Sequence, residues 1–304
     1  MNVALRSPVN RMGGKYFLAS WLSQHIPQHT LYCEPFCGAG HLLFGKEPSQ
    51  AGVINDIDNY LVTFFRVIQE PGKCQMLTNL LNYMPYSRSL WQGIRANWKQ
   101  GNIPQDEIER VAQWYYLNRT CFSGDQLRGG FAVPSTTGRN PITSFRNTIE
   151  TFDMVAERLR NVCIESLDYT DCIKRYDSED TLFFCDSPYL NSEHYYGKDS
   201  FSQDDHYNLA ELLNKVKGKA MVSHYQNSLY DELYKGWNRY EYQSFKGSHK
   251  SEGEEKPRTQ EVLYCNFQSV RHGVCLMGNL YDFLTWLMCF ELLRWILFGL
   301  YWSN

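Results

Sequence analysis

The tetrapeptide at 186–189, Asp-Ser-Pro-Tyr, has the groups needed to act on an aromatic amino nitrogen. The lone pair of such a nitrogen is delocalised into its ring, so the nitrogen is a poor nucleophile. A carboxylate and a backbone carbonyl that accept its two N–H groups would hold it pyramidal and free the lone pair for attack on a methyl group. Pro188 would stiffen the turn, and Tyr189 offers a face for a stacked base. Ordinary turns share this composition, so the tetrapeptide alone leaves both readings open.

A glycine-rich turn at 34–40, with the sequence EPFCGAG, follows a short apolar run. Its glycines let the backbone approach a ligand closely. A dinucleotide site would need a third glycine where Leu43 stands, which makes an NAD site the weaker interpretation. Asp56 ends the next apolar run, where an acid can bind the two hydroxyl groups of a ribose. A structural turn with a helix-capping aspartate is the alternative.

The elements around these motifs predict a doubly wound α/β domain, in which each motif directly follows a strand. Strands are expected at 30–33, 51–55, 162–165, 181–185, 220–223 and 261–266. Helices are expected at 15–25, 41–45, 60–69, 152–160 and 203–215, and residues 73–110 are also predicted to be helical. The stretch 247–258 is predicted to be a flexible loop.

Residues 111–149 differ in character from their surroundings. They begin as a helix at 111–117 and are then predicted to form a loop rich in Gly, Arg, Thr and Asn. Four arginines and one acid give the stretch a local charge of +3 (four minus one): Arg119, Arg128, Arg139 and Arg146 against Asp125. A basic surface of this kind binds nucleic-acid phosphates, although a solvated arginine-bearing loop has the same composition.

The bulk composition excludes some classes of protein. A net charge of −3 over 304 residues rules out a generally basic nucleic-acid binder, so DNA contact would need a local surface. The ten cysteines form no C-x-x-C pair, so neither a metal site nor a disulfide framework is expected, which fits a reducing cytoplasm. The first ten residues have no apolar core, so no signal peptide is expected.

Taken together, six segments resemble the Dam-type DNA adenine methyltransferases, and the likeness runs over roughly residues 5–267. In chain order they are 11–15 (RMGGK), 34–40, 116–124 (YLNRTCFSG), 164–169, 186–189 and 258–263 (RTQEVL). The resemblance implies a Rossmann-like methyltransferase sheet built from 1–70 and 150–267, with a mostly helical DNA-recognition domain inserted at 71–149. It also implies S-adenosylmethionine as cofactor, double-stranded DNA as partner and no metal. In a bacterial or phage-encoded protein, the expected location is the cytoplasm.

The resemblance further implies a role for each matching residue. Its catalytic residues would be Asp186, Ser187, Pro188 and Tyr189. Its cofactor-binding residues would be Arg11, Lys15, Glu34, Pro35, Phe36, Gly38, Gly40, Asp56, Asp168 and Tyr169, with Asp168 at the amino group of the cofactor's adenine. Its DNA-binding residues would be Arg119, Phe122, Ser123, Gln126, Arg128 and Arg139, with Phe122 as a wedge where the adenine leaves the duplex.

One position departs from the family pattern. Ser187 stands where most of the family has proline. The role implied there is that of the backbone carbonyl, which serine also has, so we expect activity from a less rigid turn. Two alternatives stay open: a methyltransferase of the same fold that acts on RNA or protein, and an inactive DNA-binding relic. A cognate restriction endonuclease is a further open partner.

The segment 268–304 is unusually rich in Leu, Trp and Phe. A membrane span needs about 20 nearly uncharged apolar residues. Three charged residues interrupt this segment: Asp282, Glu291 and Arg294. A helix packed on the domain or on a partner is therefore favoured over a membrane span, and an extension derived from a frameshift is the third interpretation.

Overall fold

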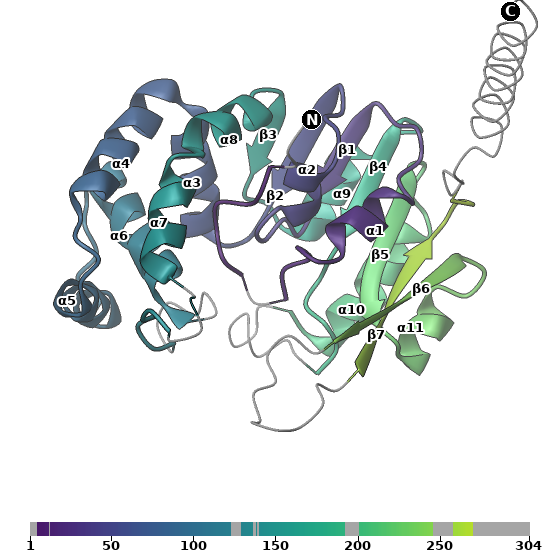
Figure 1. Ribbon diagram of the computed structural model, residues 1–304. Helices are drawn as coiled ribbons and strands as arrows, with labels where there is room; N and C mark the ends of the chain where they lie inside the picture. Colours follow the sequence, from purple (N-terminus) through teal and green to yellow (C-terminus); the bar gives the residue numbers. More distant parts are fainter. Residues whose placement is uncertain are drawn as a thin grey trace, which may run out of the picture.

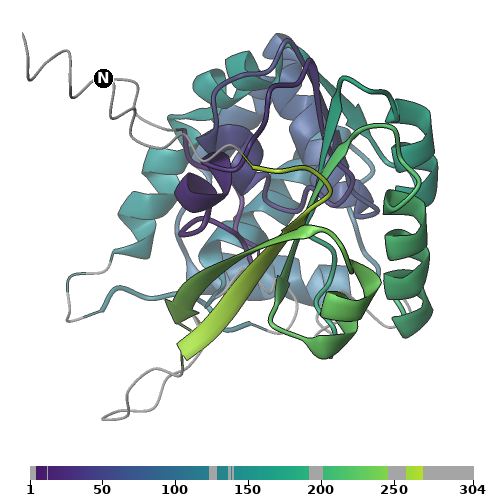
Figure 2. The same ribbon diagram turned by 90° about the vertical axis from the view of Figure 1, so that its right-hand side faces the viewer.

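Seven strands form one sheet in the order β3-β2-β1-β4-β5-β7-β6 (Figure 1). The computed structural model describes residues 5–11, 13–122, 129–135, 138, 140–191, 201–245 and 258–269. The strands are β1 (Leu31–Glu34), β2 (Ala51–Asn55), β3 (Val162–Glu165), β4 (Thr181–Cys185), β5 (Lys219–Tyr225), β6 (Asn238–Phe245) and β7 (Arg258–Cys265). Strands β1 to β5 pair in parallel, whereas β7 runs antiparallel to both β5 and β6. Strand β6 is the edge of the sheet nearest the viewer in Figure 2.

Both faces of the central strands are buried, as parallel sheets covered by helices require. Successive residues along a strand point to opposite faces, so Phe183 and Phe184 of β4 belong to two different hydrophobic clusters. The first cluster lies under helices α1 (Ala19–Ser23), α2 (His41–Gly45), α3 (Asn59–Gln69) and α8 (Phe152–Leu159). The second lies under α9 (Tyr169–Tyr176), α10 (Gln203–Leu213) and α11 (Ser228–Leu233). The architecture is therefore a three-layer α/β/α sandwich, which confirms the expected fold class.

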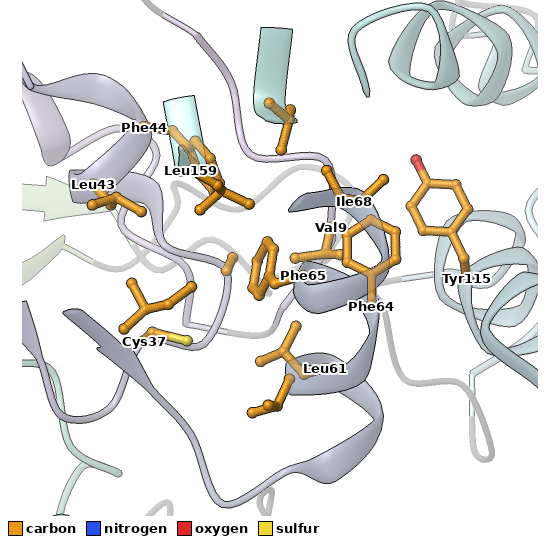
Figure 3. Close-up of a cluster of buried hydrophobic side chains, with 14 of the residues drawn as sticks. Val9, Cys37, Leu43, Phe44, Leu61, Phe64, Phe65, Ile68, Tyr115 and Leu159 are labelled. Carbon is orange, nitrogen blue, oxygen red and sulfur yellow. The ribbon is translucent and has the colours of Figure 1, made fainter. Parts of the chain in front are cut away.

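Four helices between β2 and β3 gather at the β3 end of the molecule (Figure 1). They are α4 (Pro71–Tyr83), α5 (Arg88–Lys99), α6 (Glu107–Thr120) and α7 (Pro141–Ile149). They share the first hydrophobic cluster with α3. Phe64 of α3 stacks on Tyr115 of α6 with ring centroids 5.0 Å apart and an interplanar angle of 4° (Figure 3). The helical segment thus packs directly on the layer that covers the sheet.

The local pattern located several elements with correct bounds, namely the helix at 41–45 and the strands at 51–55, 162–165 and 181–185. Helix α7 is where the prediction was wrong, because residues 141–149 were expected to be loop. The Asn140 side chain accepts hydrogen bonds from the backbone N–H groups of Ile142 and Thr143, and Pro141 stands in the first turn. Phe145 and Ile149, four residues apart, form the buried face. Asparagine followed by proline is thus a helix start here.

Three further elements were missed by the sequence prediction: α9, α11 and β6. Strand β6 is an edge strand whose described residues are only partly buried, so it lacks an apolar run. The first helix was overextended, since α1 covers only Ala19–Ser23 and a turn precedes it. No helix in the described part of the chain is long and apolar enough to cross a bilayer. The stretch 246–257 and the tail from residue 270 lie outside the described residues.

Candidate active site

Strand order brings the two motifs together. Strands β1 and β4 are parallel neighbours, with Cys33 opposite Phe183. From β1 the chain continues to β2 and β3 on one side, whereas β5 follows β4 on the other side. At such a switch point the two carboxyl-terminal turns diverge and leave a crevice, which is where open α/β sheets bind ligands. The glycine turn at 34–40 and the turn at 186–189 therefore emerge side by side.

The glycine turn has a backbone that only glycine adopts readily. Gly38 has φ +47° and Gly40 has φ +63°, both in the left-handed region that disfavours residues with a Cβ. A Cβ built on Gly38 would meet no described atom within 4 Å, so the backbone there is open to an approaching ligand. Cys37 anchors the turn, because its N–H donates to the carbonyl oxygen of Asn55 at 2.8 Å.

Glu34 supports the glycine turn from below. Its side chain is 2% exposed, and its Oε1 accepts hydrogen bonds from the Tyr32 hydroxyl at 2.7 Å and from the Leu43 N–H at 2.9 Å. Burial raises the pKa of Glu34 to about 7. Glu34 thus connects β1 to α2, and the cofactor contact that the resemblance implies for it stays a prediction. Pro35 is likewise buried, and its carbonyl oxygen accepts a hydrogen bond from Asn55.

Asn55 is a site residue that sequence reasoning missed. Its Nδ2 donates to the carbonyl oxygens of Pro35 at 2.9 Å and Leu167 at 3.0 Å, and its Oδ1 accepts from the Leu167 N–H at 2.7 Å. Asn55 is 1% exposed and thus connects the turns that follow β1 and β3. A buried amide at the end of an apolar strand was the available signal, since buried polar groups need partners.

Asp56 lies beside the glycine turn, as the sequence predicted. Its Oδ2 accepts from the Gly38 N–H at 2.9 Å, and its Oδ1 accepts from the Asp58 N–H at 2.9 Å. Burial raises the pKa of Asp56. Arg11 reaches this corner through an ion pair with Asp58, which also caps α3. The Nε of Arg11 is buried and has no hydrogen-bond partner among the described residues.

Aromatic side chains form one wall beside the glycine turn. Phe36 stacks on Tyr169 with ring centroids 5.2 Å apart, and Phe201 meets Phe36 edge-on at 5.7 Å. The Tyr169 hydroxyl donates to Asp205 at 3.1 Å, which fixes the ring. Asp168 is exposed at the start of α9, and its Oδ1 accepts from the Thr170 N–H at 2.8 Å. The wall can cover a planar ligand, with Asp168 at its solvent side.

The Asp186 carboxylate is held by two partners from distant elements. Its Oδ1 contacts the Lys15 Nζ at 2.8 Å and accepts from the Ser223 hydroxyl at 2.9 Å. The Lys15 ammonium also lies 4.3 Å from the centroid of the Tyr189 ring. Lys15 therefore sits at the turn 186–189, although the resemblance implied a cofactor contact. Ser223, at the carboxyl end of β5, gave no signal in the sequence.

Tyr189 is oriented by Glu261 and His224, two residues that the sequence analysis did not identify. Its hydroxyl donates to Glu261 Oε2 at 2.8 Å, and its ring lies 4.6 Å from the His224 ring. The Leu190 N–H donates to His224 Nε2 at 2.9 Å, so the His224 proton is on Nδ1 and donates to the Tyr225 carbonyl at 2.7 Å. Burial raises the pKa of Glu261. The isolated acid in the apolar run of β7 was the one available signal.

Ser187 is almost completely buried, at 1% exposure, and Pro188 beside it is partly buried. The Ser187 Oγ has no hydrogen-bond partner among the described residues. A hydroxyl in this state lowers the stability of the fold, because the group has lost its water without gaining a replacement. The serine side chain thus contributes no bond of its own to the turn.

His41 adds a further group near this corner. Burial lowers the pKa of His41 to about 4, with Asp186 and Lys15 close enough to influence it. Gly14 packs so tightly on the His41 ring that an added Cβ would lie 2.5 Å from its Nε2. The glycine pair in the segment 11–15 therefore allows the amino-terminal segment to lie against α2.

Arg119, for which DNA binding stays a prediction, is partly buried and hydrogen-bonds to other parts of the protein. Its Nη1 donates to Asn10 Oδ1 at 2.7 Å, and its Nη2 donates to the Thr148 hydroxyl at 2.7 Å and to the Ser144 hydroxyl at 3.1 Å. These bonds connect α6 to α7 and to the amino-terminal segment. An arginine that satisfies internal acceptors in this way is a structural cross-link.

Arg146, the fourth arginine in the charge count, is also internal. Its guanidinium donates to the carbonyl oxygens of Leu81 at 2.9 Å and Met84 at 2.7 Å, at the end of α4. Two of the four arginines behind the local charge of +3 are thus used for packing. Phe122 is 46% exposed, beside the bridge between Cys121 and Phe131, as a wedge would need to be. Four other predicted DNA-binding residues lie outside the described residues: Ser123, Gln126, Arg128 and Arg139.

No group of three or more His, Cys, Asp or Glu side chains with metal-binding geometry occurs within the residues that the structure describes. All eight cysteines in that part of the chain are free thiols.

Comparison with known proteins adds a family to this geometry. Residues 12–247 match the family model of the D12 class N6 adenine-specific DNA methyltransferases. The chain is similar to the type II methyltransferase M.MjaIII of Methanocaldococcus jannaschii, with 28% identity over 74% of this chain and 86% of the relative. It is 27% identical to the type II methyltransferase M.CviBI of Paramecium bursaria Chlorella virus NC1A, over 76% and 87% of the two chains. A DNA adenine methylase of Vibrio cholerae is 26% identical over 74% and 83%. Since the family model covers most of the chain, the protein belongs to the D12 class of N6 adenine-specific DNA methyltransferases.

Proposed function

We propose that the turn 186–189 is where this methyltransferase binds and activates an adenine extruded from duplex DNA. The observation that carries the proposal is the Asp186 carboxylate, which lies at the carboxyl end of β4 with Tyr189 beside it. The glycine turn emerges next to it from β1. An acceptor for the amino group, a ring for the base and an open backbone for a cofactor thus meet at one crevice.

S-Adenosylmethionine fits the groups on the β1 side of the crevice. The left-handed glycines Gly38 and Gly40 give an open backbone, and the carboxylate of Asp56 can accept further hydrogen bonds from ribose hydroxyls, since each oxygen has two lone pairs. The rings of Phe36 and Tyr169 offer apolar faces for a planar base. When bound, the cofactor supplies the electrophilic methyl group.

The residues of the turn have separate tasks in this proposal. Asp186 accepts one N–H of the adenine amino group, and the backbone carbonyl of Ser187 accepts the other. The two acceptors hold the nitrogen so that its lone pair faces the β1 side of the crevice. Tyr189 stacks on the base, and its hydroxyl bond to Glu261 keeps the ring in place. The partial burial of this corner limits the contact of the Asp186 carboxylate with water, which strengthens each of these bonds.

We assign DNA recognition to the inserted segment 71–149. Its helices α4 to α7 form a continuous layer with α3, and Phe122 is exposed beside the bridge that closes α6. An exposed ring at the edge of a packed helical layer can enter the gap that an extruded base leaves. Arg119 and Arg146 maintain this layer, so the phosphate contacts come from other residues of the segment.

The test is to sequence modified bases in DNA from cells that express the protein, its Asp186→Ala variant or its Asp204→Ala variant. Asp204 is an exposed acid in the first turn of α10 and serves as the matched control. We expect N6-methyladenine at one recurring sequence with the wild type and with Asp204→Ala, and none with Asp186→Ala. Methylation by Asp186→Ala at the wild-type level would contradict the assignment of the turn. Methyl groups only in RNA or protein would contradict DNA as substrate.

A further inference from the structure

One side chain, Lys15, contacts both groups that the adenine is proposed to need. The Lys15 Nζ lies 2.8 Å from Asp186 Oδ1 and 4.3 Å from the centroid of the Tyr189 ring. An ammonium above an aromatic face is attracted by the ring quadrupole, and an ammonium beside a carboxylate forms an ion pair. Lys15 thus binds the amino-group acceptor and covers the stacking surface at the same time.

Lys15 is confined at this place. Its residue is 6% exposed, and the Nζ also donates to the carbonyl oxygen of Gly13 at 3.3 Å. Gly14, the residue before Lys15, packs on His41 and thereby fixes the backbone from which the lysine extends. The acid Glu261, which accepts the Tyr189 hydroxyl, is close enough to interact electrostatically with Lys15. The ammonium therefore remains near carboxylates even when it leaves Asp186.

We propose that the Lys15 ammonium binds at the place that the adenine amino group needs, and that an extruded base must displace it. This inference rests on the proposed function of the turn 186–189. Lys15 then controls how readily a base enters the pocket, because it competes with every base that does so. Its interactions with Asp186 and Tyr189 are the ones that the base replaces.

The carboxylate that Lys15 leaves favours a base with an amino group. Displacing Lys15 leaves the Asp186 carboxylate in a partly buried place, with the Ser223 hydroxyl as its one remaining donor among the described residues. Adenine returns an N–H donor to that carboxylate, whereas a base without the exocyclic amino group leaves it unpaired. Sites that hold a buried polar group reject ligands that cannot pair with it far more strongly than they reject a mere change of size. The vacated Asp186 carboxylate thus makes the amino group a condition for stable binding of the base.

The resemblance assigned Lys15 to the cofactor, and the described contacts favour the base side of the crevice. Its Nζ contacts Asp186 and the carbonyl oxygen of Gly13, and it lies over the ring of Tyr189. The glycine turn is instead joined to Asp56 and Asn55. A cofactor role and a base-competing role predict different changes in affinity, so an experiment can separate them.

The experiment compares Lys15→Met with Lys215→Met. Methionine keeps most of the apolar stem of lysine and removes the charge. Lys215 is an exposed lysine after α10, and within the described chain its salt bridge is with Glu211. The probe is a duplex with 2-aminopurine at the target adenine of the sequence found by modified-base sequencing. This base lacks the 6-amino group and fluoresces when it leaves the stack.

We expect Lys15→Met to raise the fluorescence of the bound probe roughly fivefold over the wild type, because it removes about one competing contact. Lys215→Met should match the wild type. The discrimination between an adenine and a 2-aminopurine duplex in competitive binding should stay within twofold of the wild type, because the lysine competes with both bases alike. The affinity for S-adenosylmethionine, measured by calorimetry, should stay within twofold of the wild type.

Three outcomes would overturn the inference. Fluorescence equal to that of Lys215→Met would show that Lys15 does not compete with the base. A drop in fluorescence together with weaker cofactor binding would return Lys15 to the cofactor site. If Lys15→Met does not fold, Lys15→Arg serves in its place: it keeps the charge on a bulkier head, and extrusion above the wild type would contradict the proposal. A wild type that neither methylates DNA nor extrudes the probe would instead show that the proposed function itself fails.

Discussion

Ser187 offers a direct measure of what an unpartnered hydroxyl costs this fold. Its Oγ is buried, the residue is 1% exposed, and the described chain provides it with no hydrogen-bond partner. Leaving a buried polar group unsatisfied costs roughly 1–3 kcal/mol. We therefore expect Ser187→Ala to raise the free energy of unfolding by about 1 kcal/mol, because the substitution removes the hydroxyl and leaves almost the same volume.

For a chain of this size, 1 kcal/mol corresponds to a rise in Tm of about 2 °C. Urea unfolding followed by circular dichroism gives the free energy, provided that the slope of the transition is unchanged. Ser49→Ala is the matched control, because the Ser49 hydroxyl contacts both Lys46 Nζ and His29 Nε2. That variant should be destabilised by about 1 kcal/mol.

The same substitution separates the side chain of Ser187 from its backbone. The proposed role in catalysis belongs to the carbonyl group, which alanine retains, so Ser187→Ala should still methylate DNA. Ser187→Pro should be at least as active, since proline restores the usual family residue and limits the unfolded chain. A loss of stability in Ser187→Ala would refute the reasoning, because it would mean that the hydroxyl has a partner in solution, such as an ordered water.

Four further predictions concern the groups around the crevice. Asp56→Ala should weaken binding of S-adenosylmethionine at least fivefold, at about 1 kcal/mol per lost hydroxyl bond, and unchanged calorimetric affinity in a folded variant would remove Asp56 from the cofactor site. Glu261→Ala should lower kcat more than it raises KM, because the substitution releases the Tyr189 hydroxyl. Glu261→Gln should have a higher kcat than Glu261→Ala, and an equal loss of kcat in both variants would contradict a positioning role. Burial raises the pKa of Glu34 from 4.5 to about 7, so between these pH values the folded state retains a proton that the unfolded state loses. The contribution of Glu34 to stability is therefore full below pH 4.5 and is lost as the pH rises to about 7. The stability of Glu34→Gln relative to the wild type should grow over this window, and a constant difference would show that the carboxyl titrates normally. Arg119→Ala should lower the free energy of unfolding by about 1–3 kcal/mol and leave the salt dependence of DNA binding unchanged, whereas a reduced salt slope would place this arginine on a phosphate.

The parts of the site made of consecutive residues were predictable from local pattern. The strands at 51–55 and 181–185 and the helix at 41–45 have the bounds that apolar runs and turn residues indicated. The glycine turn and the turn at 186–189 follow strands as expected. Such features depend on short-range rules: left-handed backbone at Gly38 and Gly40, strand period, and turn composition. The same rules failed at 141–149, where a capping asparagine and a buried pair of apolar residues outweighed a polar composition.

The partners of those turns were decided by tertiary structure. Ser223 reaches Asp186 across 37 residues and Glu261 reaches Tyr189 across 72 residues, because β5 lies beside β4 in the sheet and β7 lies beside β5. Lys15 arrives from the amino-terminal segment, and no local pattern indicates that it meets the turn 186–189 rather than the glycine turn at 34–40. The identity of a polar residue in the sequence does not reveal which hydrogen-bond partner it has in the folded protein.

The arginines of the inserted segment show that the sequence likewise does not reveal which charges face solvent. Composition placed Arg119 and Arg146 on a DNA-binding surface, yet both satisfy acceptors between packed helices. Net charge is a sum over residues, whereas electrostatic attraction to DNA depends on which charges face solvent and which are paired inside. That division is set when α4, α6 and α7 pack, because burying a guanidinium is favourable only where its donors meet acceptors in the right geometry.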